Sequence, residues 1–165
     1  MTELKPVITL KSIKHMPSLS EETAAYTATI YVDGVKFAYV SNRGHGGCDE
    51  VTPCKGTYSQ IEELEGRIKA TYEPYYYKGL DRKFEESLEG LCNKELDKYL
   101  FAKEWKGRLK RKIYGIKEGA IFTWPAKYKP TAQILTMMRD KFKDHVFIND
   151  MPEEKAFELI RATEG

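Results

Sequence analysis

Residues 25–42 read AYTATIYV-DG-VKFAYVSN, two runs rich in β-branched and aromatic residues separated by Asp33-Gly34. An Asp-Gly pair between such runs predicts a hairpin with a two-residue type I′ turn, since this turn needs positive φ at both central residues. An unbroken register then predicts one apolar face, made by the pairs Val32–Val35, Ile30–Phe37 and Ala28–Tyr39. The opposite face, with Tyr31–Lys36 and Thr29–Ala38, is more polar.

Other turn and capping signals place the remaining elements along the chain. A strand over 7–14 precedes the hairpin, and a second hairpin spans 112–124 around Glu118-Gly119. About four helices are expected: one from Ser59 with Glu62 as its capping-box partner, one from about Asp81, one after Pro130, and one from the N-cap Asp150 with Glu153. A short strand is expected over 146–149. Because no βαβ rhythm appears, the pattern predicts an α+β fold with a mostly antiparallel sheet.

Length and composition indicate one globular domain, 1–165. Hydrophobic residues make up 41% and charged residues 32% of the chain, and no run approaches the roughly 20 apolar residues of a membrane span. The amino end has no apolar core of a secretion signal, and three cysteines are too few for a disulfide framework, so we expect a cytoplasmic protein. The net charge of +2 means that attraction to a polyanion has to come from local clusters.

A glycine-rich loop follows the first hairpin and is the first candidate site. Such a loop can expose backbone N–H groups to a phosphate, with a cationic and a polar side chain beside them. The expected anion-binding residues are Asn42, Arg43, Gly44, His45, Gly46 and Gly47. The alternative is a plain strand-to-helix connection in which glycines only supply turn geometry.

The same loop suggests two further alternatives. Zinc could be bound by His45, Cys48 and Cys54, although the spacing matches no standard zinc motif and a fourth ligand (Asp49, His15 or His145) would have to come from elsewhere. Catalysis could use His45 as acid or base with Asp49 or Cys48 assisting. The main expectation is neither cofactor nor catalysis.

A basic segment over 103–112 is the second candidate site. It contains six basic residues in ten, and basic charge beside an aromatic ring is typical of contact with nucleic acid. The candidate contact residues are Trp105, Lys106, Arg108, Lys110 and Arg111. The alternative is a solvated helix end.

A tyrosine cluster lies beside Pro74 and is the third candidate. Tyr75, Tyr76 and Tyr77 offer rigid contact area with hydroxyl groups, or they could line the core beneath a loop.

The helical spacing of Leu88, Leu91, Cys92 and Leu96 places Cys92 toward the core.

Three segments together resemble a loosely defined family of short proteins encoded by bacteriophages, prophages and plasmids. They are residues 8–15 with Ser18–Thr23, the Asp33-Gly34 hairpin with the loop through Asp49, and the closing run 146–161. The resemblance implies an accessory protein that acts in a host cell and counters bacterial defence. It carries no assigned activity, so no catalytic residue is transferred.

The combined features predict a non-catalytic protein that binds an anionic partner, namely a nucleotide, a nucleic acid or a host defence protein that handles one. No membrane contact is expected. The alternative from another class is a small enzyme acting on nucleotides or nucleic acids through His45 and Asp49 or Cys48. A third alternative is a pure protein-interaction module that uses the tyrosine cluster.

Overall fold

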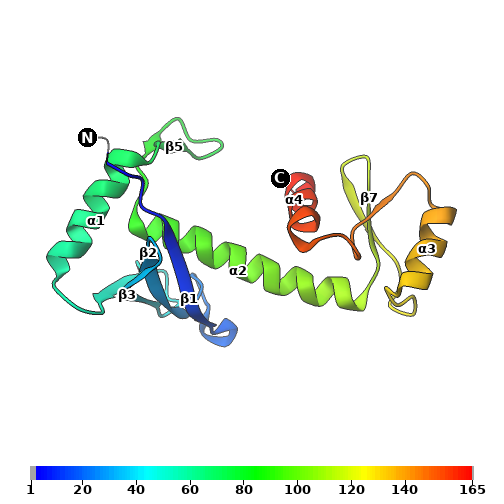
Figure 1. Cartoon of the computed structure of the whole chain (residues 1–165), viewed down its shortest axis with the longest axis horizontal. Coiled ribbons are helices and arrows are strands. Elements are labelled where there is room, and N and C mark those ends of the chain that lie inside the picture. The colour runs from blue at the N-terminus through cyan, green and yellow to red at the C-terminus, as the bar shows by residue number, and fades with distance from the viewer. Residues whose placement is uncertain (1–2, 165) are drawn as a thin grey trace. The chain divides into compact units, whose positions relative to one another are not determined.

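The chain folds into two compact units, Met1–Lys98 (unit 1) and Tyr99–Gly165 (unit 2), in a computed structural model that describes residues 3–164. Figure 1 shows the helix α2 (Leu88–Arg111), which begins in unit 1 and ends in unit 2. Each unit combines helices with antiparallel strands, which confirms the α+β class. The expectation of a single domain stays a prediction.

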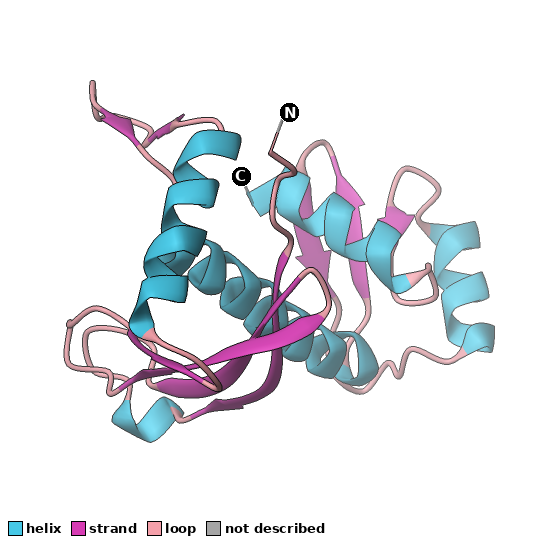
Figure 2. Cartoon of the chain, turned by 60° about the vertical axis from the view of Figure 1, so that its left-hand side comes forward, coloured by secondary structure: helices cyan, strands magenta, loops and turns pink. Residues whose placement is uncertain are grey.

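Unit 1 is built on a four-stranded antiparallel sheet in the order β1-β2-β3-β4. Its strands are β1 (Ile8–His15), β2 (Tyr26–Val32), β3 (Val35–Asn42) and β4 (Glu50–Pro53), with a short 3₁₀ turn η1 (Pro17–Leu19) after β1. The helix α1 (Tyr58–Thr71) and the start of α2 pack on one face of this sheet, and within residues 3–98 no α-helix lies over the other face (Figure 2).

The Asp33-Gly34 hairpin is confirmed, and so are its predicted pairs Val32–Val35 and Tyr31–Lys36, but the register beyond them is not the predicted one. Asp33 and Gly34 have φ values of 51° and 81°, as a type I′ turn requires. A bulge then leaves Phe37 without a partner, because Tyr31 pairs with Lys36 while Ile30 pairs with Ala38. The bulge turns the rest of β3 over, so its buried side chains are Ala38, Val40 and Asn42. The predicted apolar face containing Val35, Phe37 and Tyr39 is therefore wrong.

Two predicted helix starts in unit 1 need correction. Helix α1 begins at Tyr58, so Ser59 lies inside it, and the Thr57 hydroxyl contacts the Ser59 hydroxyl at 2.5 Å instead of capping the helix. Residues 81–87 are not helical. Within them β6 (Lys83–Phe84) pairs with β5 (Tyr75–Tyr76), and α2 begins only at Leu88.

The core of unit 1 lies between the sheet and its two helices. The strands contribute buried Tyr26, Ile30 and Val40, while α1 contributes Leu64 and Ile68. The start of α2 adds Leu88, Leu91, Cys92 and Leu96. The predicted inward position of Cys92 is confirmed, since its side chain is fully buried.

Unit 2 contains a three-stranded antiparallel sheet in the order β8-β7-β9. Its elements are β7 (Tyr114–Lys117), β8 (Ala120–Thr123), α3 (Ala132–Lys141), β9 (Val146–Phe147) and α4 (Glu153–Glu164). The second predicted hairpin is confirmed as β7–β8, and its turn residues Glu118 and Gly119 have φ values of 49° and 72°. The third predicted helix is confirmed as α3. Asp150 is not the N-cap of the last helix, because α4 begins three residues later and the Asp150 carboxylate pairs with Arg139.

The sheet of unit 2 separates two hydrophobic clusters. One contains Trp105 from the end of α2, Ile148, and Ala156, Phe157 and Ile160 from α4. The other contains Leu135 and Met138 from α3, Phe147 from β9, and Ile113, which lies between α2 and β7. Strand residues alternate between the two clusters, as expected for a sheet covered on both faces.

None of the helices among residues 3–164 is both long enough and apolar enough to span a bilayer.

Candidate functional site

The glycine-rich loop is organised by one buried side chain, Asn42, which is only 8% exposed. Its amide nitrogen donates to the Gly47 carbonyl at 3.0 Å and to the Asp49 carboxylate at 2.9 Å. Its amide oxygen accepts from the Gly44 N–H at 2.8 Å and from the Thr23 hydroxyl at 2.9 Å. All four interactions hold the loop against unit 1, so the loop is not a slack connector.

Three backbone amides of this loop already donate hydrogen bonds within unit 1. Besides Gly44, the Gly46 N–H donates to the Thr23 hydroxyl at 3.3 Å, and the Asp49 N–H donates to the Glu89 carboxylate at 2.9 Å. The Gly44 carbonyl in turn accepts from the amides of residues 21–23. An anion would have to displace internal hydrogen bonds to reach these three amides, so they do not form an open cradle. Asn42, Arg43, His45 and Gly47 do border a hollow of about 220 Å³, and anion binding there stays a prediction.

The side chains around the loop are mainly acidic. His45 is paired through Nδ1 with Glu21 at 3.2 Å. A Cβ atom built on Gly46 would lie 2.2 Å from a carboxylate oxygen of Glu22, so that acid lies directly against the loop. Arg43 is exposed, and Glu50 follows the loop at the start of β4. This acidic surrounding opposes anion binding.

The predicted catalytic arrangement is not assembled. The sole hydrogen-bond partner of His45 among residues 3–164 is Glu21. Asp49 is held by Asn42 and by the Tyr26 hydroxyl, which donates to its carboxylate at 2.5 Å. Burial and this hydrogen bond both raise the pKa of Tyr26. The tyrosine is therefore neutral and acts as a donor that fixes Asp49.

The zinc alternative can be checked through thiol reactivity. Cys48 is exposed, Cys54 is partly buried, and burial raises the pKa of Cys92 to about 12. Residues 3–164 contain no cluster of three metal-ligating side chains. We expect a thiol reagent to modify Cys48 fastest and Cys92 only after unfolding, since the thiolate is the reactive form. Zinc-dependent protection of both Cys48 and Cys54, seen by mass spectrometry, would instead support a metal site.

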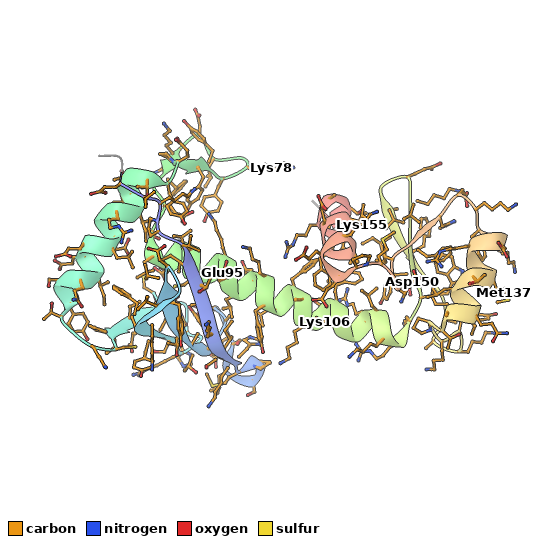
Figure 3. All side chains as sticks on the ribbon, viewed as in Figure 1. Lys78, Glu95, Lys106, Met137, Asp150 and Lys155 are labelled. Carbon is orange, nitrogen blue, oxygen red and sulfur yellow. The ribbon has the colours of Figure 1, made fainter. Side chains whose placement is uncertain are left out.

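The three tyrosines of the predicted cluster differ in exposure within the β5–β6 hairpin. Tyr75 is partly buried and packs on Tyr77 and Phe84, with ring centroids 5.3 and 6.0 Å away. Tyr76 and Tyr77 are exposed. Figure 3 shows Lys78 next to them at the outer end of the hairpin. Two of the three tyrosines are thus placed for contact with a partner, and their role stays a prediction.

The basic segment lies at the end of α2, and its tryptophan is not at the surface. Trp105 is only 2% exposed and belongs to the core of unit 2, so it is corrected from a contact residue to a core residue. Lys106 pairs with Glu153 at 3.1 Å, and Arg108 pairs with Glu104 and lies over the Trp105 ring. Two of the predicted contact residues, Lys110 and Arg111, form no ion pair with the residues that the structure describes.

Charge is distributed unequally between the two units. Unit 2 has 14 Lys and Arg against 9 Asp and Glu, a net charge of +5. Unit 1 has 13 Lys and Arg against 16 Asp and Glu, a net charge of −3. The small total charge of the chain is therefore the sum of a basic unit 2 and an acidic unit 1.

The β7–β8 hairpin brings two basic runs of unit 2 together. The Trp124 N–H donates to the Ile113 carbonyl at 3.2 Å, so the residues before β7 lie beside those after β8. We call the resulting group the basic end: Lys110, Arg111, Lys112, Lys127 and Lys129. The sequence has no acidic residue over 105–117 or 119–139. Among residues 3–164, none of these five cations has a carboxylate within 4.0 Å.

Sequence reasoning missed two of the five residues of the basic end. Lys127 and Lys129 flank Tyr128, which is partly buried, and the Lys127 ammonium lies 5.1 Å from the Tyr128 ring centre. The signal was the Lys-Tyr-Lys triplet directly after a predicted strand, which could be joined to residues 110–112 once the hairpin register was known.

No protein-family model, curated protein or solved structure matches this chain.

Proposed function

We propose that this protein binds a nucleic acid without catalysis, and that the phosphates contact the basic end. The observation that carries the proposal is the gathering of five cations, from two separate segments, in a part of unit 2 without a neighbouring carboxylate. The charges of these five cations are free to attract phosphate. The charges of Lys106 and Arg108 are partly neutralised by their ion pairs with Glu153 and Glu104.

A polyanion fits this surface better than a single phosphate does. All five side chains are exposed, and the buried polar side chains among residues 3–164, Asn42 and Glu86, both belong to unit 1. Long, hydrated side chains spread over two segments suit a repeating phosphate backbone, whose binding is driven by release of counterions. The partly buried Tyr128 could add apolar contact beside the phosphates.

The biological setting follows from the resemblance alone. An accessory protein of a phage or another mobile element would meet nucleic acid in the host cell, or a host defence protein that handles it. Counter-defence is thus part of this proposal, and the charge distribution supports only the nucleic-acid portion of it.

Binding to DNA at several salt concentrations tests the basic end. We expect Lys110→Ala/Arg111→Ala/Lys112→Ala to weaken binding of labelled DNA by at least about tenfold at low salt. The slope of log K against log[salt] should become shallower by up to about 2.7 for duplex DNA, because each lost phosphate contact removes about 0.9. Fluorescence anisotropy measures both quantities.

A second triple variant provides the matched control. Lys103→Ala/Lys106→Ala/Lys155→Ala also removes three positive charges from unit 2, but from α2 and α4 (Figure 3 labels Lys106 and Lys155). We expect it to retain most of the affinity. Equal losses in the two triple variants would show that net charge alone attracts DNA, and an absence of binding at low salt would refute the proposal.

The protein-interaction alternative predicts a different result. The exposed Tyr76 and Tyr77 lie beside an exposed Leu80 in the β5–β6 hairpin, which gives a small apolar contact surface. Capture of a host protein that resists salt and is lost in Tyr76→Ala/Tyr77→Ala would favour this alternative.

A further inference from the structure

The uncovered face of the unit 1 sheet carries a second group of cations. The buried face of this sheet contacts α1 and α2, while the opposite face is not covered by an α-helix of residues 3–98. We call this uncovered surface the open face and define it by Lys11, Lys14, Lys36, Tyr31 and Tyr39. It is the more polar face of the hairpin, and the hollows beside it are lined by three acids, Asp33, Glu50 and Glu63.

A bulge in β1 brings Lys11 and Lys14 onto the same face. Side chains three residues apart in a regular strand point to opposite faces. Here Lys11 pairs with Thr29 and Lys14 pairs with Thr27, so both lysines share the face of these two threonines. The extra residue is accommodated by Ser12, whose φ of 53° is rare for a residue with a side chain. Strained backbone of this kind is often kept at functional positions.

The bulge in β3 has the same consequence for Lys36 and Tyr39. These residues are also three apart, and their partners Tyr31 and Thr29 both lie on the open face. The Lys36 ammonium is 5.0 Å from the Tyr39 ring centre, and the Lys11 ammonium is 4.3 Å from that of Tyr31. Two separate irregularities therefore collect lysines around two tyrosines.

The lysines of the open face are available to an anionic ligand. Among residues 3–164, no carboxylate lies within 4.0 Å of Lys11, Lys14 or Lys36. A hydrogen bond with the Tyr39 hydroxyl raises the pKa of Lys36, so this lysine stays charged at neutral pH. The face also contains a shallow hollow of about 290 Å³ bordered by Ser12, Lys14 and Tyr39. The one acid at its edge is Glu50.

We infer that the open face binds single-stranded nucleic acid, with Tyr31 and Tyr39 stacking on bases and the three lysines contacting phosphates. Sheet-borne aromatic residues flanked by cations are a general solution for unpaired strands, because every base has a stacking face. Tyr31 and Tyr39 lie in neighbouring cross-strand rows, about 7 Å apart along the strands, which is twice the roughly 3.4 Å rise of duplex DNA. This spacing suits bases that are splayed apart.

A protein partner fits the open face less well. Its side chains are mainly hydroxyl and ammonium groups, and Tyr39 is its exposed large ring, at 47%. The centre of a stable protein interface is usually apolar and depleted of lysine. The inference goes beyond the proposed function, because it assigns a different surface, in the other unit, to a specific class of nucleic acid.

Tyrosine variants test the stacking directly. The probe is a labelled oligothymidylate of about 20 nucleotides, which exceeds the length covered by typical single-strand sites, compared with a duplex of equal length. We expect Tyr39→Leu to weaken binding of the single strand by about 5- to 150-fold, since one stacked base contributes about 1–3 kcal/mol. Tyr39→Phe keeps the ring and should retain most of the affinity. Duplex binding should change little in either variant.

Two controls separate this inference from the proposed function. Tyr58→Leu makes the same change at a tyrosine of α1 that is 62% exposed, and it should leave binding unaltered. If Lys110→Ala/Arg111→Ala/Lys112→Ala abolishes all binding while Tyr39→Leu changes nothing, the open face is refuted and the basic end stands. If Tyr39→Leu abolishes single-strand binding while the triple variant binds normally, the basic end is refuted and the open face stands. Equal competition by a polyglutamate peptide would overturn the assignment to nucleic acid.

Discussion

Replacement of Trp105 by alanine is expected to lower the free energy of unfolding of unit 2 by about 3–5 kcal/mol, the usual cost of truncating a buried tryptophan. The indole packs edge-to-face on Tyr114 at 5.1 Å and lies in one cluster with Ile148 and Phe157. Its loss would leave a cavity between α2, the sheet and α4. Trp105, which its basic neighbours suggested as a contact residue, is therefore expected to stabilise the core of unit 2 and not to contact a partner.

Tryptophan fluorescence in urea measures this effect selectively. The chain has two tryptophans, Trp105 and Trp124, and both belong to unit 2. In Trp105→Ala the remaining Trp124 reports the unfolding of that unit. Trp105→Phe serves as the control and should cost less, because it keeps part of the ring. Unchanged stability together with lost DNA binding would contradict the core position and return Trp105 to the interface.

Replacement of Gly44 by alanine is expected to destabilise unit 1 by about 3 kcal/mol or more. Gly44 has φ of 87°, where a side chain costs about 1–2 kcal/mol. Its added Cβ would also lie 2.2 Å from the Leu19 carbonyl oxygen, and overpacking of this kind adds about 1–3 kcal/mol. The backbone near η1 would have to move away. This movement would break the three hydrogen bonds that the amides of residues 21–23 donate to the Gly44 carbonyl.

Gly47→Ala provides the same substitution in the same loop without these penalties. No atom lies within 4 Å of the Cβ position at Gly47, and its φ is outside the positive range. We expect its stability to remain within about 0.5 kcal/mol of the parent protein, as for most surface changes. Thermal unfolding followed by circular dichroism compares the two variants. Similar, small effects would show that the loop is loose and would reopen its role as a connector or an anion site.

The outcome for the glycine loop illustrates where sequence reasoning ended. The glycines, Arg43 and His45 were correctly placed in one connection after β3. Whether the amides face solvent or the interior depends on Asn42, and that residue is buried only because of the bulge at Phe37. A one-residue change of register reverses every side chain beyond it, and a single sequence contains no local signal for such a change.

Local chemistry was enough for the turns and for the helix stripe around Cys92. Asp33-Gly34 and Glu118-Gly119 predict hairpins because glycine adopts positive φ without steric cost and aspartate tolerates it, although Glu118 also adopts a φ of 49° that is rare for its type. A 3.6-residue period directs Cys92 inward without knowledge of its neighbours. The position of Trp105 could not be obtained in this way, since its burial requires contact with α4, about fifty residues later. The two cation groups also formed only in three dimensions. Strand pairing joined Lys110–Lys112 to the segment of Lys127 and Lys129. Two bulges moved Lys14 and Tyr39 to the face that already carries Lys11 and Lys36, because long-range packing sets the register of each strand.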